Sequence, residues 1–152
     1  MTDPVQHIDA YVDGSCDGNP GPAGFGIVLI SGPHRKDLFG YIGVATNSVA
    51  ELAGALVALR VIKDKAAAVR LFTDSAYVRG MITQNWKAKT NKRLIEALRL
   101  EAKRFTSLEV VHVPGHAGVK ENERTDVLAR MAVIRKDPVY ELPEIQQGME
   151  EV

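Results

Sequence analysis

The hydrophobic pattern of this chain changes its period near residue 48, and the change limits the folds that the chain can adopt. Residues 8–13 alternate apolar and polar side chains with the period of two that is typical of a β-strand. Residues 14–23 are rich in Gly and Pro and are predicted to form a turn, and two further strands are predicted at 24–31 and 36–44. Three strands at such short spacing favour an antiparallel meander.

From residue 48 onward, segments with helical spacing of apolar residues alternate with short apolar strands. Helices are predicted at 48–63, 75–83, 90–105 and 122–136, and strands at 68–73 and 108–113. A strand that is reached through a helix runs parallel to the strand before it. The sequence therefore predicts an α/β fold, with a five-stranded mixed sheet in which an antiparallel meander is followed by parallel strands, and with helices on both faces.

Length and composition are those of an ordinary soluble protein with a single domain. No apolar run approaches the roughly 18–20 residues of a membrane span, and residues 1–7 lack the pattern of a secretory signal. The single cysteine, Cys16, excludes an internal disulfide framework and suits a reducing cytoplasm. The sequence also lacks the motifs of phosphate loops, of esterase nucleophiles and of paired-cysteine zinc sites.

Charge is distributed unevenly along the chain, although the net charge is zero. All five charged residues in 137–152 are acidic, so residues 1–136 carry an excess of five positive charges. We predict a folded domain at 1–136, followed by an acidic tail at 137–152 that is extended or disordered. Residues 79–104 hold eight basic side chains against two acidic ones, which fits either a solvated helix face or a surface that binds a polyanion.

Two apolar strands end in an aspartate, Asp13 and Asp74. If these strands are parallel neighbours, the two carboxylates lie side by side at one edge of the sheet. Adjacent carboxylates repel each other, so that one must take up a proton or a cation must lie between them. An all-oxygen site of this kind suits Mg²⁺ or Mn²⁺. Alternatively, Asp13 forms part of a turn and Asp74 caps the helix that follows it.

Two further acidic residues and one histidine are candidates for the same site, and each has a structural alternative. Glu51 completes a capping box with Ser48, in which the glutamate accepts from a backbone amide at the start of a helix. Asp126 lies in the first turn of a helix predicted to be capped by Asn122, where a negative charge complements the helix dipole. His116 lies in a loop between glycines and is either a proton-transfer group or an ordinary loop histidine.

These residues occur together in motifs that resemble those of type 1 ribonuclease H, in its bacterial and archaeal form that lacks a basic protrusion. The motifs follow the family order and extend over about residues 8–136. They are Asp13-Gly14-Ser15-Cys16 with Gly18-Asn19-Pro20-Gly21-Pro22, Thr46-Asn47 with Glu51-Leu52, Thr73-Asp74-Ser75-Ala76-Tyr77-Val78, and Gly115-His116-Ala117-Gly118 with Glu121-Asn122-Glu123-Arg124 and Asp126.

The resemblance implies the ribonuclease H-like fold and a hydrolysis of the RNA strand of RNA–DNA hybrids that depends on two Mg²⁺ ions, with Mn²⁺ as a possible substitute. The products would carry 5′-phosphate and 3′-hydroxyl ends. By this resemblance Asp13 bridges both ions, Asp126 holds the ion that activates water, and Glu51 and Asp74 hold the ion that faces the leaving oxygen. His116 matches the family histidine that assists proton transfer or product release.

The resemblance also implies a set of residues that bind the substrate. Gly14, Ser15, Asn19 and Asn47 would lie along the RNA strand, where a 2′-hydroxyl distinguishes RNA from DNA. Thr46 and Asn85 would bind a phosphate of the DNA strand, and Tyr77 or Trp86 would pack against its sugars or bases. We expect a cytoplasmic monomer that acts on RNA–DNA hybrids and has no membrane partner.

The chain departs from many bacterial members of the family after Trp86, where a basic protrusion is missing and only residues 88–91 lead to the next helix. Hybrid affinity should then be weaker, or should depend on Lys87, Lys89, Lys92 and Arg93. Asp17 adds a negative charge close to the expected metal site. Two other functions remain open, a non-catalytic module that binds hybrids or duplexes and a nuclease of the same fold that cuts DNA.

Overall fold

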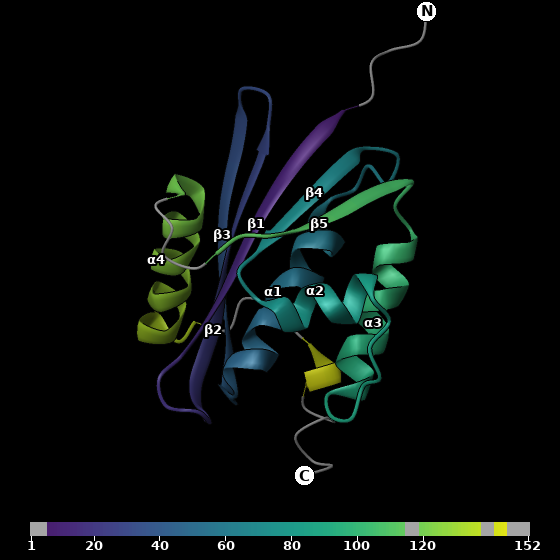
Figure 1. Cartoon of the computed structure of the whole chain (residues 1–152). Helices are drawn as coiled ribbons and strands as arrows, with labels where there is room; N and C mark the ends of the chain where they lie inside the picture. Colours follow the sequence, from purple (N-terminus) through teal and green to yellow (C-terminus); the bar gives the residue numbers. More distant parts are fainter. Residues whose placement is uncertain (1–5, 115–118, 138–141, 146–152) are drawn as a thin grey trace, which may run out of the picture.

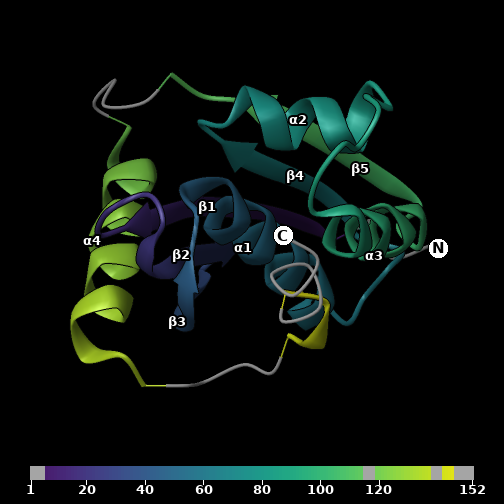
Figure 2. The ribbon, with the colours of Figure 1, turned by 90° about the horizontal axis from the view of Figure 1, so that it is seen from below.

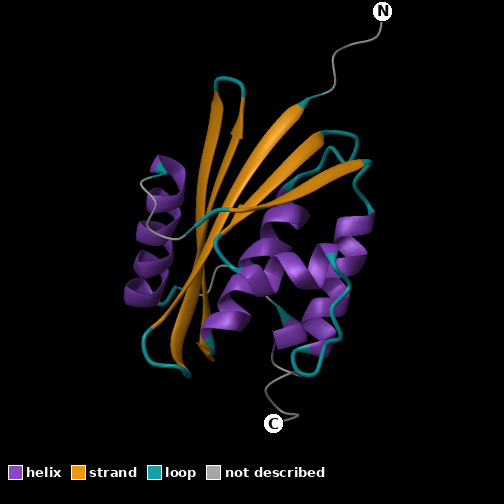
Figure 3. Ribbon diagram, viewed as in Figure 1, coloured by secondary structure: helices purple, strands orange, loops and turns teal. Residues whose placement is uncertain are grey.

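The computed structural model of this protein describes residues 6–114, 119–137 and 142–145, and its strands form one sheet (Figures 1 and 3). The strands are β1 (His7–Cys16), β2 (Gly21–Ser31), β3 (His34–Ala45), β4 (Ala68–Thr73) and β5 (Ser107–His112). Their order in the sheet is β3-β2-β1-β4-β5. Strands β1, β2 and β3 pair antiparallel, whereas β4 pairs parallel with both β1 and β5. The predicted mixed sheet is confirmed.

Helices cover both faces of this sheet, as predicted (Figures 1 and 2). They are α1 (Asn47–Val61), α2 (Ala76–Thr83), α3 (Lys92–Lys103) and α4 (Lys120–Arg135). Helix α4 lies on one face, and α1, α2 and α3 lie on the other (Figure 2). Every residue of α1 from Val49 to Leu59 is buried except Glu51, because this helix lies between the sheet and α3. A helix that is apolar all round is typical of such a central position.

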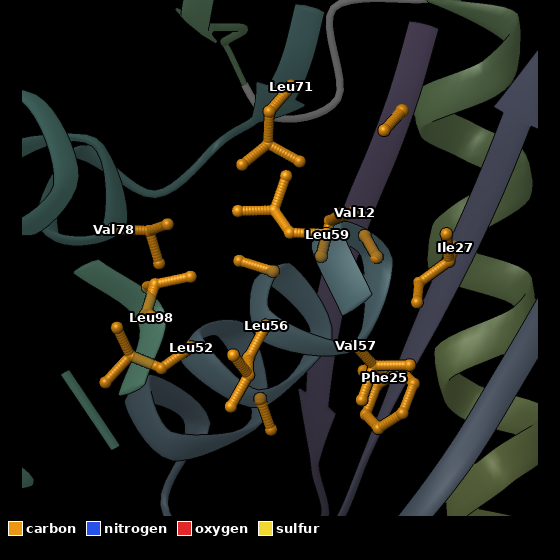
Figure 4. Packing of buried hydrophobic residues seen from close by; sticks show 14 of the residues in the cluster. Val12, Phe25, Ile27, Leu52, Leu56, Val57, Leu59, Leu71, Val78 and Leu98 are labelled. Atoms are coloured by element: carbon orange, nitrogen blue, oxygen red, sulfur yellow. The ribbon is translucent and has the colours of Figure 1, made fainter. Parts of the chain in front are cut away.

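The main core fills the space between the sheet and α1, as Figure 4 shows. Val12 of β1, Phe25 of β2 and Leu71 of β4 meet Leu52 and Leu56 of α1, and all five side chains are almost fully buried. Side chains alternate along a strand, so a core position at Val12 directs the next residue, an aspartate, to the face that α4 covers. The apolar pattern of β1 thus fixes the orientation of its polar end.

The first turn is shorter than predicted. Strand β1 continues to Cys16 and β2 begins at Gly21, so that only residues 17–20 connect them. Gly14 pairs with Phe25 in the ladder, and a Cβ atom on Gly14 would lie only 2.8 Å from the backbone nitrogen of Glu51. Of the glycines that suggested a turn, Gly14 and Gly21 are therefore ladder residues, whereas Gly18 lies in the turn with a φ of 90°.

The prediction that Asn122 caps the last helix is wrong. Helix α4 begins at Lys120 after Val119, and Asn122 lies inside it with only 6% of its surface exposed. The Oδ1 atom of Asn122 is buried without a hydrogen-bond partner among the residues that the structure describes. The sequence pattern had suggested a cap because asparagine is common at that position.

Part of the predicted acidic tail contacts the helical layer. Residues 143–145 form a single helical turn, and Leu142 and Ile145 are buried in the same cluster as α1. Glu144 pairs with Arg60 of α1 at 2.8 Å. Residues 138–141 and 146–152 lie outside the described part of the chain, and the division into a domain and a tail stays a prediction. Among the helices that the structure describes, none has the length and apolar character that crossing a membrane would require.

A nearly buried ion pair connects the end of α1 to α3, and its loss should destabilise the fold. Lys65 donates to Glu101 at 2.8 Å and to the carbonyl oxygen of Leu59 at 2.8 Å. Burial alone would raise the pKa of Glu101, but Lys65 and Arg104 outweigh it and hold the pKa below its ordinary value. Because Lys65→Ala leaves a buried carboxylate short of a partner, we expect it to lower the free energy of unfolding by about 2 kcal/mol in urea denaturation.

The control for this prediction is Lys63→Ala, which removes an exposed lysine from the same loop. We expect that change to stay within about 0.5 kcal/mol of the wild type. Equal effects of the two substitutions would contradict the importance of the ion pair.

Candidate active site

The parallel pairing of β1 with β4 brings two aspartates to the same edge of the sheet. Val12 lies opposite Thr73 in this ladder, and the next residue of each strand is an aspartate, Asp13 and Asp74. The predicted adjacency of the two strands is confirmed. Asp74 follows the end of β4, and Asp13 lies in β1 just past the last residue that pairs with β4. Both carboxylates are therefore at the carboxyl end of the parallel ladder, where sites in open α/β sheets form.

A cavity of about 300 Å³ opens at this edge and collects side chains from four elements. Strand β1, the end of β4, helix α1 and helix α4 each contribute at least one acidic residue. The residues that line it are Asp13, Gly14, Asn47, Glu51, Asp74, Asn122, Glu123, Asp126 and Val127. All four carboxylates that the sequence suggested are brought together.

Asp13 is the most deeply buried of these acids, with 9% of its surface exposed. Burial, followed by the charges of Asp74 and Asp126, raises its pKa from 3.8 to about 8. The backbone amide of Gly14 donates to its Oδ1 atom at 2.9 Å and opposes the shift only in part. A buried carboxylate among like charges requires either a proton or a cation.

Glu51 does not form the capping box that its sequence context suggested. Thr46 caps α1 instead, and its hydroxyl accepts from the amide of Val49 at 3.2 Å. The carboxylate of Glu51 lines the cavity and accepts from the side-chain amide of Asn47 at 2.7 Å. Burial raises the pKa of Glu51, and Asp74 adds to the shift while hydrogen bonds from Ser75 and Asn47 oppose it.

Asp74 is not the cap of α2 either, since Ser75 takes that position. The Ser75 hydroxyl accepts from the amide of Val78 at 3.1 Å, which leaves the Asp74 carboxylate free of a capping role. The Nε2 atom of His112, at the end of β5, lies 3.1 Å from the carbonyl oxygen of Asp74. This contact joins the end of β5 to the backbone that carries the aspartate.

Asp126 lies in the second turn of α4 rather than in its first, because the helix begins at Lys120. Its role as a partner of the helix dipole is therefore weak. The carboxylate pairs with Arg130, one turn further on, at 2.9 Å. Packing of α4 against β1 and β2 holds this carboxylate on the side of the cavity opposite Glu51, which belongs to a helix on the other face of the sheet.

The donor set of the cavity suits a hard divalent cation. Its acidic groups coordinate through oxygen only. The pKa of Asp13 is raised by burial and by neighbouring negative charges, and a bound cation would offset both effects. Within the residues described, no three acidic, histidine or cysteine side chains converge closely enough to form a finished ligand cluster. The carboxylates repel one another, and two of them have hydrogen-bond donors elsewhere: Asn47 donates to Glu51, and Arg130 to Asp126. We therefore expect the carboxylates to stay apart until a cation binds between them.

Residues expected along an RNA strand surround one side of the cavity. Gly14 lines it, and Ser15 is the next residue of β1. The Oδ1 atom of Asn19, in the turn after β1, accepts from the backbone amide of Asn47 at 3.0 Å. The structure thus connects the first turn to the start of α1, which the sequence did not indicate.

Of the residues expected to contact the DNA strand, Tyr77, Asn85 and Trp86 lie on or after α2, whereas Thr46 caps α1. Tyr77 is partly buried and packs against the core. Asn85 has a positive φ of 50° and lines a second cavity of about 410 Å³ with Arg99 and Lys103. Trp86 is 43% exposed, and its ring covers Gly80, where a Cβ atom would overlap it. The predicted proton-transfer residue, His116, lies outside the described residues.

Three residues of α4 that line the cavity were not predicted as site residues, namely Asn122, Glu123 and Val127. Asn122 precedes Asp126 by four residues, so that the two share one face of the helix. In a helix that starts at Lys120, Asn122 is a helical residue on the same face as Asp126. In a helix that is assumed to start at Asn122, the same residue is interpreted as the cap. The sequence signal was therefore present but was assigned to a cap.

Residues 6–134 match the family model described as RNase H. The chain belongs to the ribonuclease H family. It is 44% identical to the Ribonuclease H of Aeromonas salmonicida, over 88% of this chain and 94% of that protein. It is 40% identical to the Ribonuclease H of Symbiobacterium thermophilum, over 85% and 96% of the two chains. The resemblance inferred from the motifs is confirmed.

Solved structures of the family agree with this fold. The RNase H1 of the halophilic archaeon Halobacterium salinarum NRC-1 superposes with a TM-score of 0.74 at 34% identity, covering 85% of this chain and 98% of that one. LC11-RNase H1 in complex with an RNA/DNA hybrid superposes with a TM-score of 0.71 at 29% identity, with the same coverage. The predicted ribonuclease H-like fold is thus confirmed.

The raised pKa of Asp13 predicts a pH dependence of stability in the absence of divalent ions. The folded protein binds the proton of the Asp13 carboxyl more tightly than the unfolded chain does. The stabilisation that results from protonated Asp13 is therefore complete below pH 3.8 and is lost as the pH rises through about 8. Asp13→Asn cannot ionise, so we expect its stability relative to the wild type to increase by on the order of 5 kcal/mol between pH 4 and pH 8 in EDTA. Chemical denaturation of both proteins across this range measures the difference. A difference that does not change with pH would contradict the pKa shift.

Proposed function

We propose that this chain is an endonuclease that hydrolyses the RNA strand of RNA–DNA hybrids and leaves 5′-phosphate and 3′-hydroxyl ends. The observation that carries the proposal is the buried Asp13 among three other carboxylates, in a chain of the ribonuclease H family. A protein that only bound duplexes would gain nothing from so much negative charge beside a phosphate backbone. The acidic cavity therefore favours catalysis over binding alone.

Asp13, Glu51, Asp74 and Asp126 would hold two divalent ions, with Mg²⁺ as the proposed metal and Mn²⁺ as a substitute. Bound ions of this kind supply the charge that activates a water molecule and stabilises the leaving oxygen in phosphodiester hydrolysis. The chain contributes the ligand frame, because β1, β4 and α1 share one core and α4 packs against β1 and β2 on the other face of the sheet. His116 is proposed to assist proton transfer or product release.

The RNA strand would lie along the residues at the end of β1 and the start of α1. Gly14, Ser15, Asn19 and Asn47 offer backbone and amide groups that can bind a 2′-hydroxyl, the group that distinguishes RNA from DNA. Two of these residues, Asn19 and Asn47, are already joined by a hydrogen bond of 3.0 Å. The proposed specificity for hybrids depends on this part of the site.

The DNA strand would cross α2 and the start of α3. Thr46 and Asn85 are proposed to bind one of its phosphates, and Tyr77 or Trp86 to pack against its sugars or bases. The neighbouring cations Lys87, Lys89, Lys92 and Arg93 are all exposed. They are proposed to replace the missing basic protrusion as the electrostatic contact with the backbone. We further propose that the protein acts as a cytoplasmic monomer, in keeping with its single cysteine.

The proposed function is tested by incubating the purified chain with labelled RNA–DNA hybrid, duplex RNA and duplex DNA of one sequence. Each substrate is tested with Mg²⁺, with Mn²⁺ and with EDTA. We expect cleavage of the hybrid alone, supported by either metal and abolished by EDTA. Binding of the hybrid without cleavage would indicate a binding module, and cleavage of duplex DNA would indicate a DNA nuclease; either result would overturn the proposal.

A further inference from the structure

An acidic residue near the end of the chain is fastened to the helical layer. The helical turn at residues 143–145 lies beside α1 and the start of α3 (Figures 1 and 2). Leu142 and Ile145 are buried in the hydrophobic cluster that includes both of these helices. Glu144 lies between these two apolar anchors. It belongs to the segment 137–152, in which every charged residue is acidic.

Two arginines from different helices interact with the carboxylate of Glu144. Arg60, next to the last residue of α1, donates from Nη2 to Oε1 of Glu144 at 2.8 Å. Arg93, the second residue of α3, attracts the same carboxylate through its charge. Burial alone would raise the pKa of Glu144, but the hydrogen bond from Arg60 and the charges of both arginines hold this pKa below its ordinary value. The side chain is therefore an anion at neutral pH.

An anion that is held by two guanidinium groups resembles a bound phosphate in charge and in hydrogen bonding. Arginine binds carboxylates and phosphates through the same set of N–H donors. The side chain of Arg60 is 38% exposed and that of Glu144 is 18% exposed. A partly exposed ion pair of this kind contributes little to stability. A phosphate that reaches the two arginines can therefore replace the carboxylate at small cost.

Arg93 is already one of the exposed cations that we propose as contacts for the backbone of a hybrid. It lies directly after Lys92, and Lys89 belongs to the loop that leads into α3. Arg60 was not suggested by the sequence as a substrate residue, because it is distant from this loop along the chain. The shared interaction with Glu144 joins it to the same surface.

We propose that Arg60 and Arg93 form a binding site for a phosphate of the nucleic-acid backbone, and that the carboxylate of Glu144 occupies this site in the free protein. This inference rests on the proposed function and deepens it, because it concerns the regulation of hybrid binding. The hybrid must displace Glu144 before its backbone can use both arginines. Glu144 thus lowers the affinity for the hybrid and removes one phosphate contact from the interface.

Two simpler roles of Glu144 have different consequences. If Glu144 only fastened its segment to α1, its loss would lower stability and would not improve binding of nucleic acid. If Glu144 only repelled the hybrid at a distance, its loss would improve binding whether or not the two arginines were present. The proposed site requires a gain in affinity that depends on Arg60 and Arg93.

The test is the binding of a labelled RNA–DNA hybrid to the full chain in EDTA, measured at several salt concentrations. Glu144→Gln keeps the size of the side chain and removes its charge. We expect this variant to bind the hybrid about three-fold more tightly than the wild type at low salt, the size expected of one exposed ion contact. The slope of log affinity against log salt concentration should steepen by about 0.9, the value for one additional phosphate contact. Circular dichroism confirms that each variant is folded.

The decisive comparison repeats this change in a chain that lacks both arginines. Arg60→Gln with Arg93→Gln should weaken binding of the hybrid, because the phosphate site is lost. Adding Glu144→Gln to this double variant should give no gain, since neither arginine remains to be released. A three-fold gain that persists without the two arginines would overturn the inference in favour of repulsion at a distance.

Asp9→Asn is the matched control, since it also removes a negative charge and releases an arginine. Asp9 is paired with Arg70 at 2.9 Å, on the face of the sheet opposite α1 and α3. We expect wild-type affinity and salt dependence from this variant. An equal gain in Asp9→Asn would overturn the inference, as would a Glu144→Gln variant with wild-type affinity and slope. Cleavage of the hybrid by the wild type in Mg²⁺ would then show that the proposed function still stands, whereas a wild type that neither binds nor cleaves the hybrid would overturn both.

Discussion

Asp13→Asn should abolish cleavage while leaving the fold intact. The substitution keeps the volume of the side chain and removes the charge that lies deepest in the cavity. We expect the rate of hybrid cleavage in Mg²⁺ to fall by at least roughly 10³-fold, equivalent to about 4 kcal/mol of lost transition-state stabilisation. Asp74→Asn should have a similar effect, because its carboxylate ends the neighbouring strand. Single-turnover cleavage of a labelled hybrid measures both.

Asp9→Asn is the matched control for this experiment. It makes the same chemical change four residues earlier in β1, where Asp9 is paired with Arg70 at 2.9 Å and does not line the cavity. We expect wild-type cleavage from this variant. Hydrolysis at the wild-type rate by Asp13→Asn or Asp74→Asn would refute the assignment of the site, and circular dichroism would show whether any loss reflects unfolding.

Gly26→Ala should strongly destabilise the protein, because α4 rests directly on the backbone of β2. A Cβ atom on Gly26 would overlap the carbonyl oxygen of Thr125 and would lie 2.7 Å from Cβ of Leu128. Backbone cannot give way as a flexible side chain does, so we expect a loss of about 3 kcal/mol. For a chain of this length, that loss corresponds to a fall of roughly 6–12 °C in the melting temperature. Thermal unfolding followed by circular dichroism measures it.

Gly32→Asn provides the comparison within the same strand pair. Gly32 has a φ of 57° in the turn between β2 and β3, and a Cβ atom there would meet nothing within 4 Å. Asparagine tolerates this conformation, so we expect a change below about 1 kcal/mol. Gly26→Ala should also reduce cleavage, because it displaces the helix that carries Asp126. A fully stable Gly26→Ala variant would contradict the close approach of α4 to the sheet.

Most of the fold could be predicted from the sequence, because the periodicity of apolar residues and the positions of turn residues are local signals. The strand at Ala68–Thr73 was predicted with its observed bounds, since Val69, Leu71 and Phe72 mark its centre and the polar pair Asp74-Ser75 marks its end. The first turn was predicted too wide, because glycines that admit neighbouring backbone look the same as glycines that turn the chain. Gly14 illustrates this ambiguity, and only the packing of α1 against it resolves the question.

Part of the candidate site could be predicted from the sequence. The end of a strand pattern identifies Asp13 and Asp74, and their adjacency follows if the two strands are parallel neighbours, a condition that the structure meets. Helix residues gave no such signal, since Glu51 and Asp126 have sequence contexts that equally suit capping and dipole interactions. The hydrogen bonds from Asn19 to Asn47 and from Asn47 to Glu51 could not be foreseen, because they join residues whose proximity arises only in the folded chain.

The most direct test of the account uses one RNA–DNA hybrid, prepared once with a label on the RNA strand and once with a label on the DNA strand. The wild-type chain is added with Mg²⁺, and the fragments are separated at single-nucleotide resolution with analysis of their end groups. The account predicts RNA fragments with 5′-phosphate and 3′-hydroxyl ends, together with an intact DNA strand. Fragments of the DNA strand, or an RNA strand that remains whole, would contradict it.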